Sequence, residues 1–128
     1  MGRAVAFSDK PKDMDRFRNV VVIRGAMEGQ FEQHIPVPIA MWNPYGVPLN
    51  LAGPVTVSVD GKRAALLICY EQLIPWTYIN AAAHHADLFV GTSNTYWAQG
   101  TRIPQAQENT LKSWALLFGT PYLTAVNQ

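Results

Sequence analysis

The stretch Lys62–Trp76, KRAALLICYEQLIPW, decides the fold class. After Arg63 its first half is a continuous apolar run, which is typical of a strand covered on both faces in an α/β sheet. Pro75 then favours a helix over roughly Ile74–His85, because the first turn of a helix does not need the missing N–H. A buried strand that passes directly into a helix predicts a crossover unit within a parallel sheet.

The flanking segments continue this alternation. Three further elements are expected downstream, in the order strand, helix, strand: Asp87–Thr92 (DLFVGT), Ile103–Phe118 and Tyr122–Val126 (YLTAV). Upstream, Asp60-Gly61 predicts a two-residue hairpin turn after a strand over Val55–Val59, because both turn residues tolerate a positive φ. The order from Lys62 onward therefore predicts an α/β fold with crossover helices.

The first half of the chain is less regular. Asn19–Arg24 (NVVVIR) predicts a short buried strand, and the polar segment Gly25–Gln33 predicts a loop. Ile35–Pro54 carries five prolines, which exclude a regular helix or a central strand. The charged first residues around Pro11 indicate a connection. We therefore expect a linker over residues 1–18 and one folded unit over residues 19–128.

Composition excludes several classes of function. The 128 residues carry a formal net charge of +1 and no basic stripe, so no nucleic-acid partner is expected. No apolar run reaches the roughly 18 residues of a membrane span, so none is expected in this chain. One cysteine cannot form an internal disulfide. No metal site is expected, since the adjacent residues His84 and His85 do not share a helical face.

Cys69 is the candidate catalytic residue. Ligands of α/β sheets bind at the carboxyl ends of strands, where both Cys69 and Asn94 are expected. A nucleophile on a sharp strand-to-helix turn is exposed, and the backbone N–H groups after it can face a developing oxyanion. Glu71 could tune the charge there or be a first-turn acid favoured by the helix dipole. The alternative for Cys69 is a buried structural cysteine, since free cysteines are often buried.

Four segments resemble the nitrilase, or carbon–nitrogen hydrolase, superfamily. These segments are ALLICYEQLIPW (Ala65–Trp76), ADLFVGTSN (Ala86–Asn94), the region Gln105–Asn127, and FEQHIPVPIAMWNP (Phe31–Pro44). Within that superfamily the chain is most similar to the apolipoprotein N-acyltransferases and to the TraB proteins of plasmid conjugal transfer. The resemblance covers the chain from about Asn19. It implies the later half of a nitrilase-like α-β-β-α sandwich, with no cofactor.

The resemblance also implies a catalytic chemistry. The family uses a Glu–Lys–Cys triad, in which the cysteine forms a thioester acyl-enzyme. Cys69 matches that nucleophile, the Tyr70 backbone N–H matches an oxyanion donor, and Glu71 matches the acid of the family's CYE string. The lysine is not matched, because the corresponding positions hold Phe31, Glu32 and Gln33. The family's general base lies in the preceding half of the domain.

Further expectations concern substrate, partners and location. His34, Asn94 and Trp97 are candidate substrate-binding residues, although a loop histidine and a core aromatic are the simpler interpretations of His34 and Trp97. A small-molecule or acyl substrate fits the resemblance. The resemblance also fits a homodimer or an N-terminal half that this sequence does not include. The resemblance implies a bacterial protein and leaves membrane anchoring of a longer parent protein open.

Three functions stay open from the sequence. The first is a TraB-like, thioester-forming enzyme with its nucleophile at Cys69. The second is a catalytically inactive nitrilase-like scaffold that serves plasmid conjugal transfer by binding or assembly. The third is a general α/β domain with a buried cysteine. The retained CYE string favours the first, and the unmatched lysine favours the second.

Overall fold

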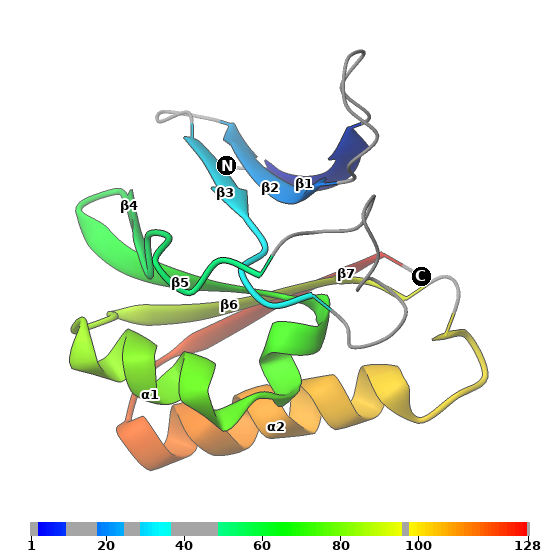
Figure 1. Ribbon diagram of the computed structural model, residues 1–128. Helices are drawn as coiled ribbons and strands as arrows, with labels where there is room; N and C mark the ends of the chain where they lie inside the picture. The colour runs from blue at the N-terminus through cyan, green and yellow to red at the C-terminus, as the bar shows by residue number, and fades with distance from the viewer. Residues whose placement is uncertain (1–2, 10–17, 25–28, 37–48, 96–97, 128) are drawn as a thin grey trace.

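The computed structural model describes residues 3–9, 18–24, 29–36, 49–95 and 98–127. Within these ranges it contains two β-sheets and two α-helices arranged in three layers (Figure 1). The N-terminal sheet has three antiparallel strands in the order β1 (Arg3–Asp9), β2 (Arg18–Arg24) and β3 (Gly29–Glu32). This sheet faces the C-terminal sheet, whose opposite face is covered by the helices.

The C-terminal sheet contains the crossover units that the sequence predicts. Its strands lie in the order β4 (Val57–Val59), β5 (Lys62–Ile68), β6 (Leu88–Asn94) and β7 (Tyr122–Asn127). β4 and β5 form an antiparallel hairpin, and β5, β6 and β7 are parallel. The hairpin turn has φ of 51° at Asp60 and 75° at Gly61, which is the backbone that this dipeptide favours.

Three helical segments connect the parallel strands. They are the 3₁₀ helix η1 (Cys69–Leu73), α1 (Pro75–Ala83) and α2 (Ile103–Phe118). α1 and α2 each have a proline in the first turn, and α2 ends at the left-handed Gly119 with φ of 62°. Both predicted helices are therefore confirmed. No helix within the described ranges is long and apolar enough to cross a membrane.

β5 is buried on both faces, as its apolar run predicts. Ala65 and Leu67 pack with Tyr78 of α1 in the core between the sheet and the helices. Leu66 and Ile68 pack on the other face with residues of the N-terminal sheet. The carboxyl end of β5 is therefore held rigidly from two sides, which fixes the position of the residue that follows it.

Two segments differ from the sequence-based expectation. Part of the connection expected over residues 1–18 is the strand β1, which pairs along its whole length with β2. The loop expected over Gly25–Gln33 contains β3, which pairs with the other edge of β2. β3 is short and polar, and its buried Phe31 holds it against the second core. Its strand conformation depends on pairing with β2, which no local pattern reveals.

Candidate active site at the end of strand β5

Cys69 lies directly after the last residue of β5 and begins η1. Its φ of 52° places it in the left-handed region, which is costly for a residue with a Cβ. Such strain persists only where the surroundings impose it, and it is often found at functional sites. The thiol is free and half-buried. β5 therefore ends in a sharp turn that carries a partly accessible sulfur atom.

Two buried side chains hold this turn through the backbone of Ile68. The Ile68 N–H donates to Glu71 Oε2 at 2.9 Å, and the Ile68 carbonyl accepts from Gln33 Nε2 at 3.3 Å. Gln33 Nε2 also donates to the Ile35 carbonyl at 2.8 Å. The segment after β3 is thus joined to the residue immediately before Cys69, so the N-terminal sheet helps to fix the turn.

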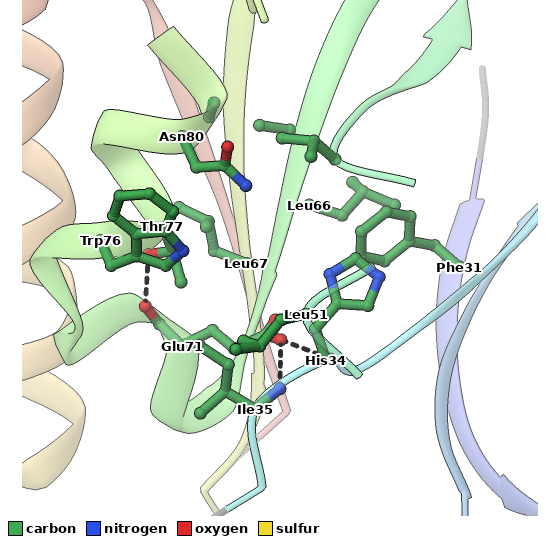
Figure 2. Close-up of a pocket in the computed structure, with 13 residues that line it drawn as sticks. Phe31, His34, Ile35, Leu51, Leu66, Leu67, Glu71, Trp76, Thr77 and Asn80 are labelled. Carbon is green, nitrogen blue, oxygen red and sulfur yellow. Dashed lines mark hydrogen bonds between the residues drawn. The ribbon is translucent and has the colours of Figure 1, made fainter. Parts of the chain in front are cut away.

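Glu71 also joins η1 to that segment. Its side chain is 2% exposed, and Oε1 accepts hydrogen bonds from the backbone N–H groups of His34 and Ile35 (Figure 2). Burial raises the pKa of Glu71 to about 7, while the three backbone hydrogen bonds act in the opposite direction. With both carboxylate oxygens bound by backbone donors, Glu71 organises the turn.

The environment of the thiol favours its protonated form. Burial raises the pKa of Cys69 above its ordinary value, and the charge of Glu71 adds to that increase. The Gln107 side chain and the Tyr70 backbone N–H lower the pKa, but by less than burial raises it. Gln107 Nε2 lies 3.9 Å from Cys69 Sγ. The thiol therefore needs further activation to act as a nucleophile at neutral pH.

The other expected site residues are distributed around this turn. Tyr70 follows Cys69 in η1 and is half-buried. Asn94 is the last residue of β6, lies opposite Asn127 of β7, and has an exposed side chain. Trp97 lies outside the described residues. Among the residues that the structure describes, no group of three metal-ligating side chains forms a site.

His34 lines a small cavity on the side of α1 (Figure 2). Its ring centroid lies 4.9 Å from that of Phe31, and burial lowers the pKa of the imidazole. Trp76 and Asn80 of α1 line the same cavity, as does Glu71. Cys69 does not line it. His34 is thus connected to the turn through the hydrogen bond from its backbone N–H to Glu71.

Two glutamines near the site were not identified from the sequence. Gln33 and Gln107 are both buried, and both lie within hydrogen-bond range of the turn. Glutamine is rarely a catalytic residue, so the sequence gives no reason to assign either one to the site. One signal was available for Gln107: it precedes Leu111 and Ala115 at four-residue spacing on the buried face of α2. A polar residue in an apolar helical stripe indicates a buried polar contact.

Comparison with known proteins places this geometry in context. No family model matches the chain. A conjugal transfer protein TraB from Agrobacterium fabrum (strain C58 / ATCC 33970) is 34% identical over 116 residues, which is 84% of this chain and 28% of the relative. A probable TraB from Sinorhizobium fredii (strain NBRC 101917 / NGR234) is 35% identical over 126 residues, 90% of this chain and 32% of the relative. The chain is TraB-like. It spans less than a third of the length of these relatives.

Solved structures show the fold of this TraB-like chain. A carbon–nitrogen hydrolase from Helicobacter pylori G27 superposes with a TM-score of 0.70 at 15% identity, over 97% of this chain and 46% of that one. An amidase from Nesterenkonia sp. AN1 superposes with a TM-score of 0.65 at 16% identity, with the same coverage of each chain. The TraB-like chain therefore has part of a nitrilase-like fold, which confirms the expected fold class and resemblance.

Proposed function

We propose that this TraB-like chain carries a thioester-forming nucleophile, Cys69, of the kind used by carbon–nitrogen hydrolases and N-acyltransferases. The observation that carries the proposal is the left-handed Cys69 at the end of a doubly buried strand. A mutant of the Nesterenkonia amidase shows the Michael addition of acrylamide at its active-site cysteine. Such chemistry requires an acyl donor, an amide or an ester, and a small molecule would suffice.

The proposed step transfers one acyl group to sulfur. The Cys69 thiol loses its proton to a base, and the thiolate attacks the carbonyl carbon of an amide or ester. The resulting oxyanion would accept hydrogen bonds from backbone N–H groups such as that of Tyr70. The oxyanion then collapses, the carbon–nitrogen or carbon–oxygen bond breaks, and the leaving group takes a proton. Water or an amine later attacks the thioester and releases the thiolate.

A second function is favoured by a different observation. Burial raises the pKa of Cys69, and the carboxylate of Glu71 is occupied by three backbone N–H groups. Burial thus favours the thiol form of Cys69, and the backbone engages both carboxylate oxygens of Glu71. These features suit a catalytically inactive scaffold that serves conjugal transfer through binding or assembly.

Acylation with p-nitrophenyl butyrate distinguishes the two functions. The purified chain is mixed with the ester at pH 7.5, and p-nitrophenolate release is followed together with the intact mass. The acyl-enzyme function predicts a rapid burst of one equivalent and one butyryl group on Cys69, mapped by peptide mass spectrometry. Cys69→Ser and the urea-unfolded chain are the controls. Labelling of the folded chain no faster than that of the unfolded chain would refute the nucleophile and support the scaffold.

A further inference from the structure

Gln107 has an environment that its role in helix packing does not explain. It is 3% exposed and lies on the face of α2 that also buries Leu111 and Ala115. Removing an amide from water costs free energy unless its polar atoms find hydrogen-bond partners. A leucine at this position would continue the apolar stripe at no such cost. The retained amide therefore indicates a specific polar contact.

Among the described residues, only the Nε2 end of the amide has a hydrogen-bond partner. Nε2 lies 3.9 Å from Cys69 Sγ, at the long end of hydrogen bonding to sulfur. Within the part of the chain that the structure describes, the buried Oε1 atom has no hydrogen-bond partner. A buried acceptor left unpaired in a native protein requires a physical explanation. One explanation is that Oε1 accepts a hydrogen bond from the S–H group of Cys69 when the sulfur is protonated.

A thiolate and a thiol need opposite partners. A thiolate only accepts hydrogen bonds, so it is matched by the Nε2 N–H donor, whereas a thiol can donate its S–H to the Oε1 acceptor. Rotation of the amide by 180° about its last side-chain bond exchanges the positions of these two atoms. We propose that Gln107 is a positioning residue for Cys69, and that its amide turns to hydrogen-bond the sulfur as a thiol or as a thiolate.

The proposed role has a consequence for reactivity at this site. Because a hydrogen bond to an ionised acceptor is stronger than one between neutral groups, Gln107 stabilises the thiolate more than the thiol. The thiolate is the form that would attack an acyl donor, so the inference deepens the proposed function. It does not depend on acyl transfer, because alkylation of a cysteine by iodoacetamide also requires the thiolate. Failure of acylation and failure of the Gln107 proposal are therefore separate results.

Alkylation of the full chain by iodoacetamide tests the proposal. The rate is measured from pH 6 to pH 10 in the wild type, in Gln107→Met, which keeps the side-chain length, and in Gln107→Glu. Gln105→Met is the matched control, since Gln105 is an exposed residue of the same helix. We expect Gln107→Met to raise the apparent pKa of Cys69 and to slow alkylation at pH 8 roughly three- to tenfold. Gln107→Glu raises the apparent pKa of Cys69 further through charge repulsion, and Gln105→Met leaves that pKa unchanged.

A second measurement avoids substitution of Gln107. The side-chain NH₂ signals of Gln107 in ¹⁵N-labelled wild-type chain should shift with pH and report the same pKa as the alkylation profile. Cys69→Ala should abolish that titration. The proposal would be overturned if both folded Gln107 variants had the alkylation profile of the wild type. It would also be overturned if the Gln107 signals did not shift as Cys69 titrates.

Discussion

Replacing Glu71 with glutamine tests whether burial or backbone hydrogen bonding dominates the pKa of Glu71. Burial raises the pKa of Glu71 from 4.5 to about 7. Between these pH values the folded chain keeps a proton that the unfolded chain has released. The stabilisation is therefore complete below pH 4.5 and is lost as pH rises through 7. At about 1.4 kcal/mol per pKa unit, the free energy of unfolding falls by about 3 kcal/mol over this window.

The Glu71→Gln variant has no charge to bury, so it lacks this pH dependence. It carries a different cost, because its Nε2 group can only donate, and it must face a backbone N–H that donates to a Glu71 oxygen in the wild type. One unsatisfied buried donor costs about 1–3 kcal/mol. We therefore expect the variant to be less stable than the wild type at pH 5 by about that amount. The deficit should disappear or reverse by pH 8, as ionisation destabilises only the wild type.

Urea unfolding followed by tryptophan fluorescence, at intervals from pH 5 to pH 8, gives the two stability curves. The quantity to compare is the difference in the free energy of unfolding between the wild type and the variant at each pH. Burial lowers the pKa of His34, which makes stability rise with pH in the opposite sense, but this contribution is common to both proteins. If the deficit of the variant grows as pH rises, the three backbone hydrogen bonds outweigh burial and the reasoning is wrong.

Two further predictions concern backbone geometry. Because Cys69 has φ of 52°, Cys69→Gly should be more stable than Cys69→Ala by about 1 kcal/mol in urea unfolding, and an equal or more stable alanine variant would contradict the left-handed turn. Gly91→Ala should lower the free energy of unfolding by about 1–3 kcal/mol. The reason is that a Cβ at Gly91 would lie 2.6 Å from Gln72 Oε1 and 2.8 Å from Leu111 Cδ2. Gly29→Ala, in open space on β3, is the control, and similar losses for both variants would refute the packing argument.

Local sequence patterns determined the C-terminal half of the fold. The continuous apolar run of β5 required cover on both faces, and Asp60-Gly61 specified the hairpin before it. The prolines and the terminal glycine bounded α1 and α2. These signals act over a few residues, through steric limits on φ and through burial, so they remain visible without tertiary structure. The position of Cys69 at the end of β5 followed directly from them.

Only the tertiary structure decided what surrounds Cys69. Glu71 matched an acid in a catalytic string, yet its carboxylate is bound by backbone groups from the segment after β3. Gln33 and Gln107 reach the turn from sequence separations of more than 30 residues. β1 and β3 are strands because β2 pairs with both. The sequence by itself thus determined that a cysteine ends a buried strand. Its protonation and its partners depend on burial and on long-range hydrogen bonds, which exist only once the two sheets and α2 have packed together.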